Sequence, residues 1–102
     1  MRQVAVIGIG QTKIDEHWDK SLRELGGDAA FAAMQDAGME KVDSLYVGNM
    51  LSSMVSGQNQ LGTFFSDWIG LWKQEAVKIE AACGSGAAAF RSACLLYTSR
   101  CV

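Results

Sequence analysis

Three short apolar runs divide the chain. The first, residues 4–9, is rich in β-branched side chains and ends in Gly8-Ile9-Gly10. An uninterrupted apolar run of this kind is typical of a strand buried on both faces of a parallel sheet. The runs at residues 45–49 and 76–80 predict a second and a third strand.

Between the first two runs, the apolar residues recur with helical spacing. Ser21 and Glu24 are arranged as a capping box, in which each residue's side chain accepts from the other's backbone amide. Gly38 is a helix stop, so we expect a helix over residues 22–37. Gly26 and Gly27 inside this helix each cost about 1 kcal/mol relative to alanine, unless a close neighbour needs the room.

Two further helices follow the second and third runs. Phe64, Trp68 and Trp72 are spaced four apart, which predicts an amphipathic helix over about residues 60–70. Another helix begins at about Ala87, directly after the third strand. Strands that alternate with helices in this order predict an α/β fold with right-handed crossovers.

Composition narrows the class of protein. The chain has 102 residues, of which 49% are hydrophobic and 20% charged, and its formal net charge is −2. These values exclude disorder and give no support for binding to nucleic acid or to a membrane surface. No apolar run approaches the roughly 20 residues that a membrane span needs, and the N-terminal run is too short for a signal peptide.

The cysteines suggest the compartment. Cys83, Cys94 and Cys101 are an odd number with neither disulfide-like nor zinc-like spacing. We therefore expect a reduced, cytoplasmic protein without a metal or other cofactor.

Three candidate sites are weak. Gly8-Ile9-Gly10 lacks the third glycine of a dinucleotide fingerprint, because Lys13 stands at that position, so a tight structural turn is favoured. His17 is the only histidine, lies in a polar loop and is interpreted as a solvated residue. The aromatic residues from Phe64 to Trp72 favour a core or a subunit interface over a ligand groove.

The strongest candidate is Cys83, which lies between a strand and a helix and is followed only by small residues, Gly84-Ser85-Gly86-Ala87. A thiolate at a helix N-terminus is stabilised by the helix dipole and by unpaired amides. The same amides can donate to the oxyanion that forms when an acyl group is attacked. Pattern alone leaves two interpretations open, a nucleophile and a small buried apolar residue.

The order of these segments resembles that of the thiolases, in particular the sterol-carrier-protein-x-like branch with the acetyl-CoA acetyltransferases of archaea and many bacteria. The likeness covers residue 2 to about residue 93. It is carried by four segments, residues 4–13, 21–25, 45–50 and 77–86. The Gly26-Gly27 pair departs from the usual alanine-rich helix of the family.

The resemblance implies the chemistry of an acyltransferase with acyl-CoA as substrate. Cys83 matches the cysteine that takes the acyl group from one CoA thioester before a second acyl-CoA, as its enolate, accepts it. In the family, the base and most contacts to CoA come from the C-terminal half, so we expect no turnover by this chain. Two alternatives remain: a ketoacyl-synthase-like condensing enzyme, and a non-catalytic module that binds through the surface of residues 50–72.

The resemblance also implies a partial thiolase fold and a homodimer. The expected part is the first βαβαβα unit of the N-terminal domain, with a mixed sheet and a buried nucleophile helix. In the family the third strand, here about residues 77–80, pairs across a two-fold axis. Residues 50–72 are expected near that interface.

The last nine residues do not resemble a thiolase. Residues 94–102 can be back-translated as TGT CTC TTA TAC ACA TCT AGA TGT GTA, and the first half of this string matches a transposon end used in sequencing libraries. We therefore expect residues 1–93 to be a truncated thiolase N-terminal domain and residues 94–102 to be a library scar. The alternative is a natural short protein whose helix continues through Leu95 and Leu96.

Overall fold

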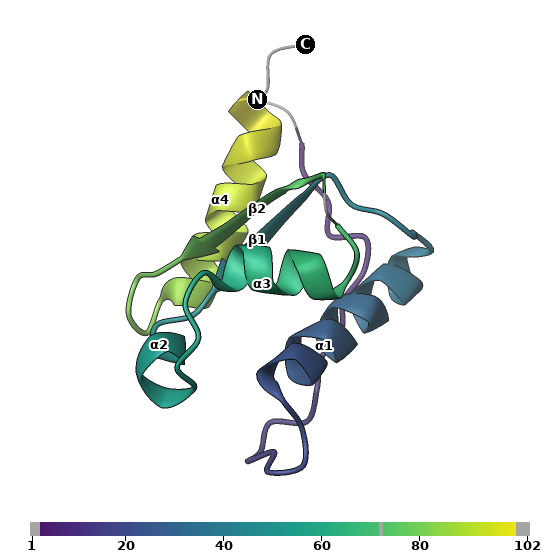
Figure 1. The fold of residues 1–102 in the computed structure, drawn as a ribbon. Coiled ribbons are helices and arrows are strands. Elements are labelled where there is room, and N and C mark those ends of the chain that lie inside the picture. Colours follow the sequence, from purple (N-terminus) through teal and green to yellow (C-terminus); the bar gives the residue numbers. More distant parts are fainter. Residues whose placement is uncertain (1–2, 72, 100–102) are drawn as a thin grey trace.

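The computed structural model describes residues 3–71 and 73–99. Within them the chain forms four helices and two strands (Figure 1). In chain order these are α1 (Leu22–Ala37), β1 (Ser44–Gly48), α2 (Ser52–Val55), α3 (Leu61–Trp68), β2 (Glu75–Ile79) and α4 (Ser85–Ser99).

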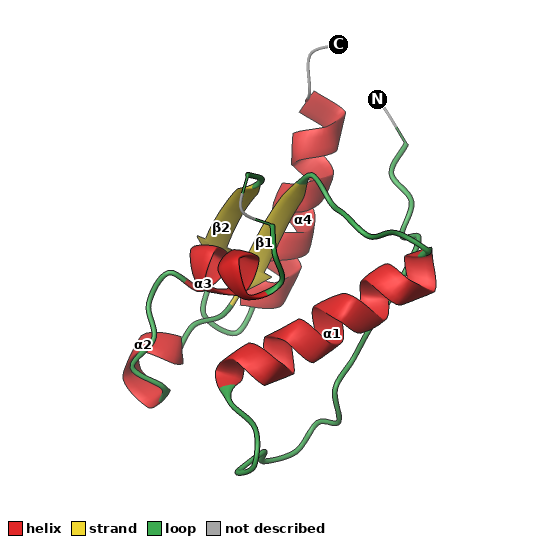
Figure 2. Ribbon diagram, turned by 45° about the vertical axis from the view of Figure 1, so that its right-hand side comes forward, coloured by secondary structure: helices red, strands yellow, loops and turns green. Residues whose placement is uncertain are grey.

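The two strands form a parallel sheet at the centre of the molecule. Ser44 lies opposite Glu75 at one end of the ladder, and Gly48 lies opposite Ile79 at the other. Helix α3 covers one face of the sheet and α4 covers the other (Figures 1 and 2), and both helices contact both strands. The α/β class predicted from the sequence is therefore confirmed, with a parallel pair in the described part of the sheet.

Helix α1 has the predicted bounds because its end signals are local. The Glu24 amide donates to the Ser21 hydroxyl at 3.2 Å, and the Ser21 amide donates to the Glu24 carboxylate at 3.5 Å. Gly38 ends the helix at φ 69°, a left-handed conformation that glycine adopts without a steric penalty. Both ends agree with the capping box and the stop read from the sequence.

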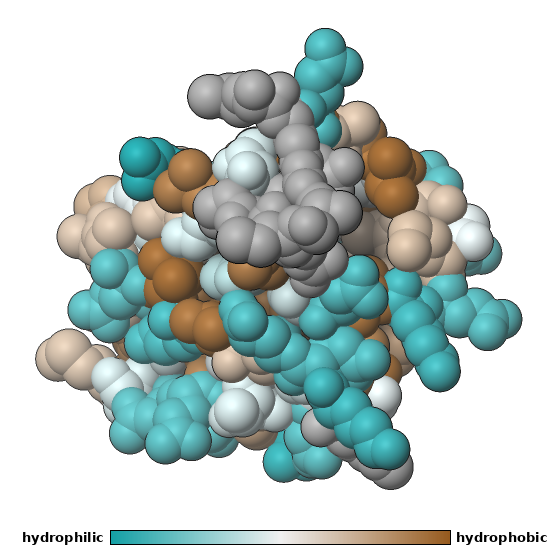
Figure 3. Space-filling view, turned by 90° about the horizontal axis from the view of Figure 1, so that it is seen from above, coloured by the Kyte–Doolittle hydropathy of each residue, from teal (hydrophilic) through white to brown (hydrophobic). Residues whose placement is uncertain are grey.

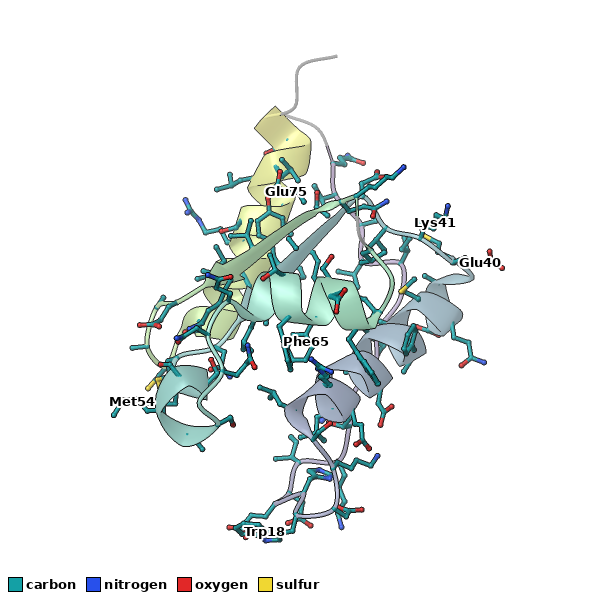
Figure 4. The ribbon with its side chains drawn as sticks, viewed as in Figure 1. Trp18, Glu40, Lys41, Met54, Phe65 and Glu75 are labelled. Atoms are coloured by element: carbon teal, nitrogen blue, oxygen red, sulfur yellow. The ribbon has the colours of Figure 1, made fainter. Side chains whose placement is uncertain are left out.

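The paired glycines of α1 make room for aromatic side chains of α3. A Cβ on Gly26 would collide with the ring of Phe65, and a Cβ on Gly27 would lie 2.8 Å from the indole nitrogen of Trp68. Phe65 points from α3 toward α1 in Figure 4 and is 8% exposed. The two glycines therefore have the close neighbours that the sequence analysis required, Phe65 and Trp68.

The N-terminal run, residues 4–9, does not form the predicted buried strand. It has no strand partner among the described residues, and the side chains of Val6, Ile7 and Ile9 are 62%, 64% and 74% exposed. The segment lies instead along α1, where the Ile9 amide donates to the Asp36 carboxylate at 3.0 Å. The prediction was wrong because a strand needs a hydrogen-bonded neighbour, which no local pattern supplies.

Two apolar hollows lie between α1 and α4. One, of about 520 Å³, lies between α1, β1 and α4, and the other, of about 320 Å³, lies between residues 4–8, α1 and α4. Seen from above in Figure 3, apolar side chains reach the surface between polar ones. Of the α4 residues whose burial is described, only Ser85 and Ala89 are buried, so the helix expected to be buried is largely exposed here.

Candidate active site

Cys83 lies where β2 turns into α4. Strand β2 ends at Ile79, α4 begins at Ser85, and the Cys83 thiol between them is free and exposed. This turn follows the carboxyl end of a parallel strand, the edge at which open α/β sheets bind their ligands. The structure therefore places the predicted nucleophile at the sheet edge suited to a substrate.

Backbone hydrogen bonds close the turn around Cys83. The Gly84 amide donates to the Ala81 carbonyl at 2.9 Å, and the Ser85 amide donates to the Ala82 carbonyl at 3.2 Å. The first helical bond of α4 follows at once, from the Ala88 amide to the Gly84 carbonyl at 2.9 Å. Cys83 thus lies directly before the first turn of α4, at the positive end of the helix dipole.

The side chain of Ser85 is part of the same turn. Its hydroxyl accepts from the Ala81 amide at 2.9 Å and donates to the Ala82 carbonyl at 2.7 Å, and the residue is 5% exposed. Ala82 has a φ of 47°, in the left-handed region that residues with a Cβ rarely adopt. Sequence analysis did not assign a role to Ser85, and the only signal was its place in the small-residue run after Cys83.

The loop after β1 lies at the same edge of the sheet. The Asn49 amide extends the ladder by donating to the Ile79 carbonyl at 3.2 Å, and its side-chain oxygen accepts from the amides of Leu51 and Ser52 at 3.0 and 2.7 Å. In Figures 1 and 2, α2 lies beside the loop that carries Cys83. Asn49 is therefore a second residue near the site that the sequence did not single out.

Backbone contact fixes the start of α4 against β1. A Cβ on Gly48 would collide with the Ser85 carbonyl and would lie 2.8 Å from the Gly86 nitrogen. The last residue of β1 therefore touches the first residues of the nucleophile helix. This contact sets the distance between the two chain segments that meet at the carboxyl edge.

Charged groups near the turn are few. Lys78 and Glu80 form an ion pair at 3.4 Å between β2 and the turn. Toward the opposite end of the sheet, a hydrogen bond of 2.6 Å to Glu75 raises the pKa of Tyr46 above its ordinary value. Small and uncharged residues follow Cys83 in the turn, and the thiol is exposed.

The weaker candidates have structural explanations. Backbone of α1 lies where a Cβ on Gly8 or Gly10 would be, so both glycines have a structural role, but through a close helix contact and not through the predicted tight turn. His17 is held by the Lys13 carbonyl, 2.7 Å from its Nε2, in the loop before α1. That loop, whose Trp18 is labelled in Figure 4, is far from the turn that carries Cys83.

The predicted aromatic helix is present as α3. Phe65 is part of the core, whereas Trp68 is 48% exposed. The central carbon of the Arg23 guanidinium lies 4.8 Å from the centre of the Phe64 ring and 5.7 Å from that of the Trp68 ring. Trp72 lies outside the described residues. The burial of Phe65 agrees with the predicted core role, and the exposed Trp68 leaves the interface role a prediction.

Only one of the other two cysteines, Cys94, lies within the described residues. Cys94 is half-buried and lines the smaller hollow, and Cys101 lies outside the described residues. Within residues 3–71 and 73–99, no cluster of acidic, histidine or cysteine side chains could hold a metal ion. No helix in that part of the chain is long and apolar enough to cross a membrane.

Comparison with known proteins connects this geometry to a family. Residues 4–96 match the family described as thiolase, N-terminal domain. The chain is 41% identical to an acetyl-CoA acetyltransferase of Methanothermobacter thermautotrophicus, with 97% of this chain and 26% of that protein covered. It is 40% identical to the acetyl-CoA acetyltransferase of Methanocaldococcus jannaschii, with 93% and 25% covered.

A third relative has a different substrate in its name. The chain is 32% identical to a benzoylsuccinyl-CoA thiolase subunit of Thauera aromatica, with 90% of this chain and 23% of that protein covered. The chain thus spans about a quarter of the length of the relatives it matches.

Proposed function

The chain belongs to the thiolase family, as part of its N-terminal domain, and on that premise we propose that it supplies the nucleophile of a CoA-dependent acyltransferase. Cys83 accepts the acyl group of an acyl-CoA as a thioester. The archaeal relatives are named acetyl-CoA acetyltransferases, which supports an acetyl-CoA C-acetyltransferase type of reaction.

The observation that carries the proposal is the position of the Cys83 thiol. It is exposed at the start of α4, at the carboxyl edge of the sheet, in a turn of small residues. A thiolate there is both a good nucleophile and a good leaving group, which a transfer in two steps requires. The helix N-terminus supplies backbone amides toward the charge that develops on the thioester oxygen.

The two steps balance around one sulfur atom. In the first, the Cys83 sulfur bonds to the thioester carbonyl carbon, the bond from that carbon to CoA breaks, and CoA leaves as its thiol with the proton that Cys83 gives up. In the second, an acyl-CoA loses an α-proton to a base and its carbanion carbon bonds to the acyl carbon. The bond to Cys83 then breaks, and thiolysis is the reverse sequence.

No imidazole faces Cys83 to serve as the base of the second step, because His17, the one histidine of the chain, lies in the distant loop before α1. We therefore expect the 102-residue chain to be acylated once and not to turn over. Incubation with acetyl-CoA followed by peptide mass spectrometry tests this: an acetyl group is expected on Cys83 and not on Cys94. Multiple turnover, or equal labelling of the two cysteines, would contradict it.

We also propose that the complete protein is a homodimer. The surface around α2 is apolar and open, with Met54 83% and Val55 76% exposed, and Met54 points away from the fold in Figure 4. Exposed apolar groups gathered on one segment are typical of interfaces between subunits. Sedimentation of a chain as long as the relatives should give twice the monomer mass, and a monomer would refute the assignment.

Two further proposals concern the compartment and the last residues. The cytoplasm is proposed because an acyl-accepting thiol must stay reduced, and cell fractionation tests it. Residues 94–102 are proposed as a library scar because they can be back-translated to a string whose first half matches a transposon end used in sequencing libraries. When the gene is amplified and sequenced without a transposon step, the codons after residue 93 should not encode the nine residues 94–102. Codons that do encode them would refute the scar.

A further inference from the structure

We propose that Ser85 is a positioning residue for acyl transfer, whose buried hydroxyl holds the turn that presents Cys83. The inference rests on the proposed function, because it assigns Ser85 a role toward that nucleophile. Ser85 does not touch the reacting atoms itself and acts through the turn that holds Cys83.

The hydroxyl ties together both sides of Ala82. It accepts from the Ala81 amide at 2.9 Å, and it donates to the Ala82 carbonyl at 2.7 Å. Ser85 is 5% exposed, so these two groups satisfy its hydroxyl where water has little access. A buried hydroxyl with a donor and an acceptor fixed in place rigidifies the backbone that it bridges.

The bridged residue needs such support. Ala82 has a φ of 47°, which brings its Cβ close to the following carbonyl and is unfavourable for an L-residue other than glycine. Strained conformations persist where the surrounding structure over-determines them, and they gather at functional sites. The Ser85 hydroxyl bonds, together with the two backbone bonds of the turn, provide that constraint.

The consequence reaches Cys83, the next residue after Ala82. With the turn held, the thiol lies directly before α4, at the end of the helix where backbone amides can donate to a charged sulfur. Without the hydroxyl, the Ala81 amide and the Ala82 carbonyl lose a partner. The backbone of Ala82 can then relax toward negative φ and carry the thiol away from the helix axis.

The test measures the rate of Cys83 alkylation by iodoacetamide in the 102-residue chain, with Cys94 on the same helix as the internal reference. Peptide mass spectrometry separates the two rates. In Ser85→Ala, we expect the Cys83 rate to fall by roughly two- to fivefold, the range that charge interactions at helix termini span, while the Cys94 rate stays constant. Ser92→Ala, the same change further along α4, should alter neither rate.

A second pair of variants separates the hydroxyl from folding. Ser85→Thr and Ser85→Val have the same shape, so any crowding by the added methyl group is common to both. The threonine variant should keep a faster Cys83 rate than the valine variant. General unfolding would instead raise the alkylation rate of half-buried Cys94, so that the rates of the two cysteines become similar.

Equal Cys83 rates in the Thr and Val variants, or an unchanged rate in Ser85→Ala, would overturn the proposal. The readout needs no acyl-CoA. A chain that fails to take up acetyl from acetyl-CoA but shows the expected alkylation pattern would refute the proposed function and leave the positioning role. The reverse pattern would refute the positioning role alone.

Discussion

At the scale of single residues, close backbone contacts decide which positions tolerate a side chain. Gly48 and Gly86 show the contrast, because they lie on opposite sides of one contact. A Cβ on Gly48 would meet backbone atoms of Ser85 and Gly86, whereas a Cβ on Gly86 would meet nothing within 4 Å. Gly48 is therefore required by a close backbone contact, whereas Gly86 has room for a side chain.

Gly48→Ala should destabilise the chain by about 1–3 kcal/mol, since the start of α4 must move to admit the methyl group. Gly86→Ala is the matched control, and it should leave the free energy of unfolding unchanged or raise it by up to about 1 kcal/mol, because alanine is the better helix former. Urea denaturation measures both. Similar losses in the two variants would contradict the contact between β1 and α4.

Tyr46 gives a prediction for pH. Its hydroxyl donates to Glu75, and this bond raises the pKa of the phenol above its ordinary value. The bond exists while Tyr46 is protonated, so its contribution to stability is complete below the ordinary tyrosine pKa and is lost as the pH rises through the raised value. Stability should therefore decline at alkaline pH.

An absorbance titration of tyrosinate checks this shift. Glu75→Gln should move the Tyr46 transition to lower pH, toward that of a free tyrosine, because the charged acceptor is gone. The chain has two tyrosines, so Tyr46→Phe identifies which transition belongs to Tyr46. A transition that does not move in Glu75→Gln would show that the hydrogen bond does not set the pKa.

At the scale of elements, the sequence predicts best what local signals encode. The bounds of α1 follow from a capping box and a terminal glycine that lie within the helix or next to it. Residues 4–9 have an equally clear apolar pattern, yet they form no strand in the described chain. Whether a strand forms depends on a partner, and that information lies elsewhere in the chain.

The contact between α1 and α3 also depends on residues far apart in sequence. Arg23→Ala should cost about 0.5–1 kcal/mol, because the guanidinium lies over the rings of Phe64 and Trp68. Arg91→Ala, an exposed arginine on α4, should change the unfolding free energy by less than about 0.5 kcal/mol. Chemical denaturation followed by tryptophan fluorescence measures both, and equal effects would refute the cation–π contact.

The candidate site was predictable only in part, because the sequence shows local signals and not the geometry of the turn. The sequence could single out Cys83 from its position between a strand and a helix, but pattern alone also allowed a small buried apolar residue; in the structure the residue is exposed. The role of Ser85 and the left-handed conformation of Ala82 could not be read from the sequence. A hydroxyl that bonds to backbone three and four residues earlier has a role only once the turn geometry is known.

At the scale of the whole molecule, the chain has an exposed cysteine, Cys83, at one edge of its sheet and apolar surfaces that no described part of the chain covers. The hollows between α1, β1, α4 and residues 4–8 are lined mostly by apolar side chains. The relatives are about four times as long as this chain, since it spans 26% and 25% of the two archaeal enzymes. The open apolar surfaces occur in a chain that spans only about a quarter of the length of these relatives.

The central claim is that Cys83 is the acyl-accepting nucleophile, and a chimera tests it most directly. Residues 1–93 of this chain would replace the matching segment of the acetyl-CoA acetyltransferase of Methanothermobacter thermautotrophicus, to which the chain is 41% identical. Acetyl transfer between CoA thioesters should be measurable in the chimera and in its Ser92→Ala control, and undetectable in Cys83→Ala. Transfer that persists in a folded Cys83→Ala chimera would contradict the account.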